Sequence, residues 1–195
     1  MTARPAIADQ LRSALGEFDR LDQAVYTTIA ATPTPTLDQS LRRISNAANY
    51  SRLWMVTAAG LALFGGRPGR RAAIQGMAAI GVSSAVANLI GKQLLVRARP
   101  DRLSAAVIQE RHVRMPTSTS FPSGHAASAF AFATAAGSEL PLLSPPLQAL
   151  ATAVAYSRVH TGVHYPGDVI VGAAIGSAAG SLVGSLARRI AGRRG

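Results

Sequence analysis

The chain of 195 residues contains no cysteine, which excludes disulfide bonds, thiolate metal sites and a cysteine nucleophile. Acidic residues are also scarce, because nine aspartates and glutamates stand against 20 lysines and arginines. They form no carboxylate cluster of the kind that binds magnesium, so we predict no metal ion and no other cofactor. Charged residues make up only 15% of the chain and hydrophobic residues 48%. This composition is typical of a membrane protein.

The excess of basic residues gives a net charge of +11, which predicts an anionic partner. Two such partners are a nucleic acid and the surface of an anionic membrane. The basic residues lie at the ends of apolar runs and do not line one face of a soluble helix, so we predict a lipid bilayer as partner and no nucleic acid. Of the 20 basic residues 19 are arginine, and Lys92 is the only lysine.

The N-terminal segment has the pattern of an amphipathic helix. Residues 6–30 carry apolar side chains at steps of three and four, with several charges among them. Because the charges are too many for a membrane span, we expect this helix to lie along the membrane interface or to pack against the bundle. The prolines of residues 32–36 end it. We therefore divide the chain into an N-terminal interfacial helix and turn, 1–35, and a transmembrane domain, 36–195.

Five apolar stretches predict a transmembrane bundle of about five spans, which makes the predicted fold class all-α. A helix needs about 20 apolar residues to cross the hydrocarbon core of a bilayer. The expected spans are 44–66, 72–91, 126–143, 147–156 and 169–187. We expect a tight basic turn at 67–71 and a long polar loop at 93–121. Glycine recurs at every fourth position of the last span, at Gly172, Gly176, Gly180 and Gly184, which predicts close contact with a neighbouring helix.

Three short motifs lie at the ends of these spans. They are Lys92 with Arg99-Pro100 after six intervening residues, Pro122-Ser123-Gly124-His125, and Ser157-Arg158 followed after five residues by His164 and after three more by Asp168. Because successive spans run in opposite directions, all three motifs are expected at the same end of the bundle. The opposite end receives the basic segments 67–71 and 188–194. By the positive-inside rule that end is cytoplasmic, which predicts an extracytoplasmic site.

The residues of the motifs predict a phosphate-handling site. Lys92, Arg99 and Arg158 would repel one another unless they bind an anion, and the planar guanidinium group matches phosphate oxygens. The second motif begins a helix, so its free backbone amides and the helix dipole also attract an anion. Ser123 can cap this helix, and Gly124 lets a ligand approach the backbone closely.

His164 and Asp168 are four residues apart, so the carboxylate can hold one imidazole nitrogen and leave the other facing the site. An alternative is that Asp168 serves as a helix cap and that the histidines are interfacial polar residues. A zinc site built from the four histidines is disfavoured, because only His160 and His164 have a suitable spacing. We assign His160 a structural or pocket-lining role and His112 a place in the solvated loop.

The order and spacing of the three motifs resemble the signature of the type 2 phosphatidic acid phosphatase (PAP2) family, and every position of that signature is matched. The resemblance implies an all-helical membrane bundle with a PAP2-like core. It also implies that His164 attacks phosphorus to give a phosphohistidine, that Asp168 orients it and that His125 protonates the leaving group. The phosphoryl oxygens would be held by Lys92, Arg99, Ser123, Gly124 and Arg158.

A site at the level of the lipid headgroups favours a phospholipid or polyprenyl phosphate as substrate. Phosphatidate, phosphatidylglycerol phosphate, polyprenyl diphosphate and polyprenyl-phosphosugar phosphates all fit the same site, and we expect residues 101–121 to discriminate among them. An alternative function is a phosphotransferase that uses the same histidine. A non-catalytic basic membrane scaffold and a nucleic-acid binder are alternatives of other classes, and a haloperoxidase is disfavoured because that branch of the family is soluble. The sequence predicts no oligomeric state.

Overall fold

The computed structural model describes residues 7–91 and 96–193, and all regular secondary structure in these two ranges is helical. The prediction of an all-helical chain is therefore confirmed for the described part. The helices are α1 (Ile7–Ala31), α2 (Pro35–Ala47), η1 (Asn49–Ser51), α3 (Arg52–Phe64), α4 (Gly66–Val86), η2 (Ala87–Gly91), η3 (Gln109–Arg111), α6 (Gly124–Glu139), η4 (Pro141–Leu143), α7 (Ser144–His160) and α8 (Pro166–Gly192). Helix η2 is a π-helical turn that continues α4.

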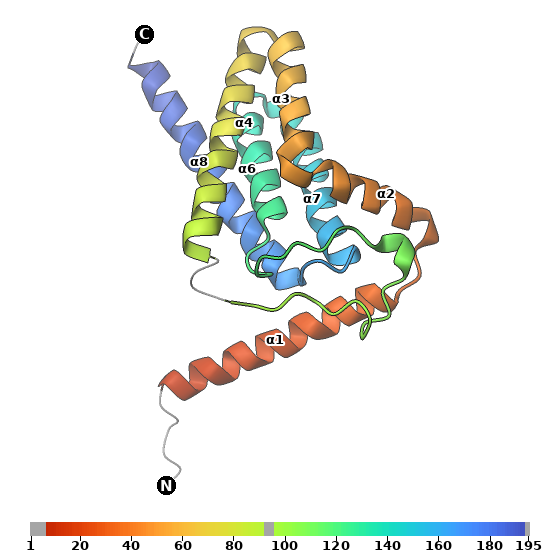
Figure 1. Cartoon of the computed structure of the whole chain (residues 1–195). Coiled ribbons are helices and arrows are strands. Elements are labelled where there is room, and N and C mark those ends of the chain that lie inside the picture. Colours follow the sequence, from red (N-terminus) through yellow and green to blue (C-terminus); the bar gives the residue numbers. More distant parts are fainter. Residues whose placement is uncertain (1–6, 92–95, 194–195) are drawn as a thin grey trace.

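Helix α6 lies at the centre of the bundle and packs against α4, α7 and α8, while α3 packs against α4 (Figure 1). Its sequence is rich in alanine and apolar on all sides, as expected for a helix surrounded by neighbours. The main hydrophobic cluster joins it to α3, α4 and α7. At the centre of that cluster, the rings of Trp54 and Phe132 lie with centroids 5.2 Å apart.

The glycines of α8 form the contact with α6, as predicted from their spacing. A Cβ atom on Gly172 would lie 2.4 Å from the carbonyl oxygen of Ser123, and one on Gly176 would lie 2.2 Å from that of Ala127. Both distances are too short for a real side chain, so the two helices can pack this closely only because these positions lack one. Helix α8 therefore holds the first turn of α6 against its own N-terminal half.

Helix α1 crosses one end of the bundle at a steep angle to the other helices (Figure 1). It contacts the bundle through a narrow face that includes Asp22, Tyr26 and Ala30, all of which are buried. Most of its large apolar residues remain exposed, among them Leu15 at 67% and Leu21 at 63%. The helix therefore packs against the bundle along one narrow face and leaves most of its apolar residues uncovered.

Two helices in the described part are long and apolar enough to cross a membrane, Gly66–Leu89 and Pro166–Gly192. Helices α3, α6 and α7 are shorter, at 13, 16 and 17 residues. They correspond to the other predicted spans, but the number of about five spans stays a prediction.

Two predicted boundaries are wrong. The span expected at 44–66 is broken at Tyr50 and Ser51, which adopt left-handed backbone conformations with φ of 54° and 58° between α2 and α3. The turn expected at 67–71 lies instead at Gly65 and Gly66, where Gly66 has a φ of 60°, and 67–71 forms the beginning of α4. The chain reverses at Gly66, because glycine adopts the left-handed conformation easily. Pro68 and Gly69 then lie in the first turn of α4, where a proline is tolerated.

Candidate active site

The turn between α7 and α8 carries His164 and places it beside Asp168. The backbone amides of Val163 and His164 both donate to the carbonyl of Arg158, at 3.0 and 3.2 Å, and Gly162 supplies the positive φ that this tight turn needs. Pro166 then begins α8, which puts Asp168 in its first turn. The local sequence therefore reverses the chain within a few residues and brings the predicted histidine and aspartate together.

His164 presents its two ring nitrogens to different partners. Its Nδ1 lies 3.6 Å from Oδ2 of Asp168 and 3.4 Å from the hydroxyl of Ser120, and its Nε2 lies 3.3 Å from Nη1 of Arg99. A separation of 3.6 Å is longer than a hydrogen bond, and such contacts often shorten only when substrate is bound. The predicted arrangement, with one nitrogen toward the carboxylate and the other toward the cations, is present.

The imidazole of His164 is only 3% exposed, and burial lowers its pKa to about 4. The carboxylate of Asp168 opposes this shift, whereas the positive charges of Arg158 and Arg99 lower the pKa further. The ring is therefore neutral at physiological pH. A neutral imidazole with a free lone pair on Nε2 is the form that can attack an electrophile.

Asp168 is fully buried and each of its oxygens has partners. Oδ2 accepts hydrogen bonds from the hydroxyl of Ser120 and from the backbone amide of Tyr165, the latter at 2.9 Å. Oδ1 accepts from Nη1 of Arg97 at 2.9 Å. The contact with Tyr165 is one half of a capping box in which Tyr165 is the N-cap residue, so Asp168 helps to cap α8 from the third helical position while its carboxylate also faces His164. The two roles are therefore compatible.

Arg99 is held by backbone carbonyl groups from two segments, the loop before α6 and the turn between α7 and α8. Its guanidinium donates to the carbonyl oxygens of Ser118, Thr119 and Val163, at 2.9, 3.0 and 2.9 Å. None of these acceptors is charged, and no acidic group of the described residues forms an ion pair with Arg99. The guanidinium thus keeps its positive charge available beside Nε2 of His164.

Arg158 is 1% exposed and lies in the last turn of α7. Its Nη1 donates to the hydroxyl of Ser45 at 2.5 Å, while its buried Nε finds no acceptor among the described residues. A buried donor without a partner costs free energy, about 1–3 kcal/mol. An anion bound at this guanidinium would supply an acceptor, which fits a phosphate group.

The second motif forms the start of α6. The hydroxyl of Ser123 accepts from the amide of Ala126 at 3.5 Å, which is the predicted cap, and the amide of Ser123 donates to the carbonyl of Asp168 at 2.9 Å. A Cβ atom on Gly124 would meet nothing within 4 Å, so the backbone here borders open space. His125 follows, and its Nε2 lies 3.0 Å from the side-chain oxygen of Asn49.

A cavity of about 510 Å³ opens beside His125. It is lined by Asn49, Tyr50, Arg114, Met115, Pro116, Thr117, Ser118 and His125. Ser118 also accepts from Arg99, so the cavity adjoins the cationic part of the site. Its wall comes largely from the loop in which we expected substrate discrimination.

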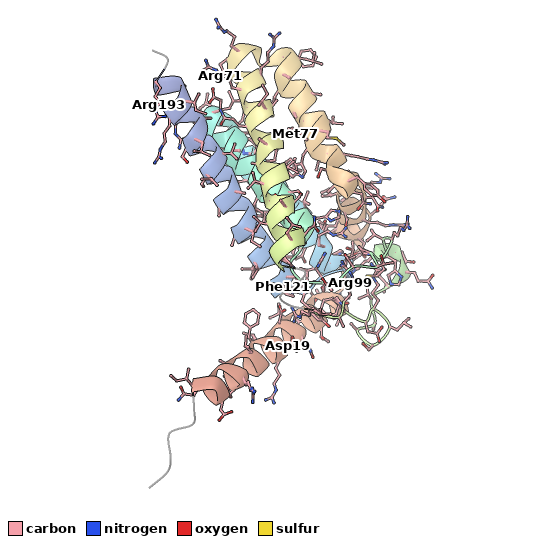
Figure 2. All side chains as sticks on the ribbon, turned by 60° about the vertical axis from the view of Figure 1, so that its left-hand side comes forward. Asp19, Arg71, Met77, Arg99, Phe121 and Arg193 are labelled. Atoms are coloured by element: carbon pink, nitrogen blue, oxygen red, sulfur yellow. The ribbon has the colours of Figure 1, made fainter. Side chains whose placement is uncertain are left out.

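The predicted site residues that the structure describes therefore gather at one end of the bundle. Figure 2 shows Arg99 and Phe121 at this end, close to Asp19 of α1, and Arg71 and Arg193 at the opposite end. Lys92, the remaining predicted phosphate ligand, lies outside the described residues. Among the described residues, no three His, Asp or Glu side chains gather in a way that could hold a metal ion.

Sequence reasoning missed several residues that hold the site together. Arg97 contacts Asp168, Ser120 contacts both Asp168 and His164, Asn49 contacts His125, and Ser45 contacts Arg158. Arg97 lies in the spacer of the first motif and Ser120 two residues before the second. Their proximity to the motifs was the only signal available, because nothing in the sequence indicates which neighbour a loop side chain will contact.

His160 has the structural role that we expected, whereas His112, which we expected to be solvated, is half-buried and contacts the backbone of its own loop. His160 Nε2 lies 2.9 Å from Asp38, which also pairs with the buried Arg111, and His112 Nε2 lies 3.0 Å from the carbonyl of Val107. Both histidines therefore contact protein groups away from His164.

The chain is similar in sequence to a known protein family and to proteins that are named as phosphatases. The family model of the PAP2 superfamily matches residues 72–190. A decaprenylphosphoryl-5-phosphoribose phosphatase of Mycobacterium tuberculosis is 37% identical over 144 residues, which cover 72% of this chain and 75% of that protein. The protein of the same name from Mycolicibacterium smegmatis is 31% identical over 160 residues, covering 81% and 84%.

Two solved structures resemble the fold. The PAP2-type phosphatidylglycerolphosphate phosphatase of Bacillus subtilis superposes with a TM-score of 0.69 at 22% identity, covering 89% of this chain and 88% of that one. LpxE of Aquifex aeolicus superposes with a TM-score of 0.65 at 25% identity, covering 84% and 94%. The helical arrangement in Figure 1 is therefore similar to that of the Bacillus subtilis phosphatase.

Proposed function

The chain belongs to the PAP2 superfamily, and on this premise we propose that it is a membrane-embedded lipid phosphatase that works through a phosphohistidine at His164. The observation that carries the proposal is the position of the neutral imidazole, with Nδ1 toward Asp168 and Nε2 3.3 Å from the guanidinium of Arg99. A neutral nucleophile beside a cation that forms no ion pair with the described carboxylates is suited to attack on a phosphate ester.

In the proposed first step, Nε2 of His164 attacks the terminal phosphorus, an N–P bond forms, and the bond from that phosphorus to the ester oxygen of the leaving group breaks. Asp168 stabilises the positive charge that develops on the ring, and His125 gives its proton to the departing oxygen. In the second step, water attacks phosphorus, His125 takes up a proton from that water, and the N–P bond breaks to release inorganic phosphate. The hydrogen bond between His125 and Asn49 supports this role, because it holds the ring at the mouth of the cavity.

The phosphoryl oxygens would be held by Lys92, Arg99 and Arg158 and by the start of α6 at Ser123 and Gly124. Phosphoryl transfer depends mainly on positioning and on stabilising charge, which several fixed cations and backbone amides can supply. The Nε of Arg158, which has no acceptor in the part of the chain that the structure describes, supports this assignment. We propose that catalysis needs no metal ion.

We propose a polyprenyl-phosphosugar phosphate as the substrate class, with phosphatidate, phosphatidylglycerol phosphate and polyprenyl diphosphate as competing lipids. Two observations support it. The mycobacterial relatives are named for decaprenylphosphoryl-5-phosphoribose. The cavity beside His125 offers the side chains of Asn49, Thr117 and Ser118 for sugar hydroxyls and Arg114 for an anionic diester, whereas a diacylglycerol leaving group would use few of these contacts.

The site would then face the extracytoplasmic side of a bundle with about five spans. The arginines at the opposite end, such as Arg71 and Arg193 in Figure 2, support this orientation. The exposed apolar residues of α1 support an interfacial helix in 1–35, separate from the transmembrane domain in 36–195.

The test is phosphate release by the protein purified in detergent, from a panel of these four lipids, with and without EDTA. We expect release from the phosphosugar lipid that EDTA does not abolish, and a loss of at least about a thousandfold in kcat for His164→Ala, since a nucleophile has no substitute. His112→Ala is the matched control and should keep full activity. The proposal fails if the wild type releases no phosphate from any lipid, or if His164→Ala remains active.

A further inference from the structure

Arg97 joins three carboxylates from two separate parts of the chain. Its Nη2 donates to Asp19 at 2.6 Å, and its Nη1 donates to Asp22 at 2.6 Å and to Asp168 at 2.9 Å. Asp19 and Asp22 belong to α1, whereas Asp168 belongs to α8 and faces His164. The guanidinium also lies over the ring of Tyr165, 4.1 Å from its centroid. One side chain therefore connects the N-terminal helix to the aspartate of the site.

Helix α1 makes a second contact at the same point. Asp22 is 4% exposed, and its Oδ1 accepts from the backbone amide of Gly167, one residue before Asp168, at 2.7 Å. A Cβ atom on Gly167 would lie 2.9 Å from Oδ2 of Asp22 and 3.0 Å from the ring of Phe18. Helix α1 thus docks directly on the first turn of α8, and this close approach requires glycine at position 167.

The contact with Arg97 determines how the carboxylate of Asp168 is oriented. Arg97 holds Oδ1, which leaves Oδ2 for Ser120, the amide of Tyr165 and the side of His164. Because Asp168 is fully buried, the adjacent cation also stabilises its ionised form. Without Arg97, Asp168 and the two α1 carboxylates would repel one another, and α1 would lose its main polar attachment at this end.

We infer that Arg97 is a positioning residue that acts through Asp168, and that α1 is part of the active site's support through Asp19 and Asp22. Asp168 keeps its orientation toward His164 only while Asp19 and Asp22 of α1 remain in contact with Arg97 and the start of α8. The inference rests on the proposed function of His164, since it assigns a role in the same reaction. Arg97 itself touches neither the substrate nor the reacting atoms.

The experiment compares Arg97→Met, which keeps the length of the side chain and removes its charge, with Arg97→Lys, which keeps the charge. We expect kcat to fall about tenfold to hundredfold in Arg97→Met, the usual size of a lost hydrogen bond to a charged group, while KM changes less than about threefold. Arg97→Lys should recover part of the loss. The control is Arg12→Met, because Arg12 is an exposed α1 residue that pairs only with Asp9 at 3.9 Å among the described residues.

A double-mutant cycle then tests the role of α1. The variant carrying Asp19→Asn and Asp22→Asn should lower kcat in the wild-type background, and should lower it no further when Arg97→Met is already present. Circular dichroism and gel filtration in detergent establish that each variant is folded. If Arg97→Met does not fold, Arg97→Lys and the Asp19 and Asp22 variants still complete the comparison.

Three results would overturn the inference. They are full activity of Arg97→Met, a loss confined to KM, and additive effects in the cycle. An inactive wild type, or a fully active His164→Ala, would instead refute the proposed function. If His164→Ala is inactive but Arg97→Met is fully active, the proposed function stands and only the role of Arg97 is refuted.

Discussion

Substitution of Gly172 by alanine tests whether the contact between α6 and α8 sets the geometry of the site. The added Cβ would lie 2.4 Å from the carbonyl oxygen of Ser123 and 3.2 Å from the Cβ of Ala126. Real Cβ contacts are essentially never closer than 3.0 Å, so the helices must separate locally by roughly 0.6 Å or more, at a cost of about 1–3 kcal/mol in stability. The start of α6 carries Ser123 and His125, whereas α8 carries Asp168. If the two helices separate, the distance therefore changes between His125, the predicted acid, and His164, the predicted nucleophile in the turn before α8.

A displacement of about 1 Å at a reacting group can cost about a hundredfold in rate, so we expect kcat of Gly172→Ala to fall roughly tenfold or more. Phosphate release and thermal unfolding in detergent measure the two effects. Gly184→Ala is the control on the same helix, because the Cβ there would meet the movable hydroxyl of Ser138 at 2.7 Å, far from the site. Gly60→Ala is the control for helix propensity, since its Cβ would meet nothing within 4 Å and should stabilise α3 by up to about 1 kcal/mol. Wild-type activity in Gly172→Ala would refute the reasoning.

Four other groups of the site and its surroundings can be tested one at a time. Because burial lowers the pKa of His164 to about 4, the acid limb of kcat/KM should fall near that pH and not near 6.5, and a midpoint above 6 would contradict it. Ser120→Ala removes a hydrogen bond to Asp168 and should lower kcat about tenfold with little change in KM; an unchanged kcat would exclude this role. Arg114→Met should raise KM for a phosphosugar lipid about tenfold and leave phosphatidate unaffected, whereas equal effects on both lipids would argue against a headgroup contact. Asp38→Asn leaves the buried Arg111 without its carboxylate and should destabilise the fold by about 3–5 kcal/mol in thermal unfolding, and an unchanged unfolding temperature would contradict it.

The pH dependence of stability should show the contribution of Asp38 with a defined sign. Burial raises the pKa of this carboxyl, but hydrogen bonds from Thr34, His160 and Arg111 and the charge of Arg111 outweigh it, so the net pKa is lowered. A group with a lowered pKa in the folded state contributes stability above its unfolded pKa of about 4, and that stability is lost as the pH falls. The wild type should therefore lose more stability than Asp38→Asn on acidification from pH 6 to pH 3. Equal losses would show that Asp38 makes no such contribution.

Much of the site could be predicted because its residues lie within short motifs at helix ends. The spacing of His164 and Asp168 places both at one turn, and the capping position of Ser123 follows from local backbone preferences. The alternation of apolar stretches then brings Arg99, His125 and Arg158 to the same end of the bundle. These inferences need only the helical repeat and the chain direction, which the sequence carries locally.

The tertiary structure alone decided which other side chains complete the site. The contacts of Arg97 with α1, of Asn49 with His125 and of Ser45 with Arg158 join residues 75 to 113 positions apart. The left-handed backbone at Tyr50 and Ser51, which breaks the expected first span, likewise lies in a segment whose composition resembles a continuous helix. Such contacts depend on how the helices cross, so the whole bundle decides which distant side chains meet, and no local pattern of residues indicates those pairs.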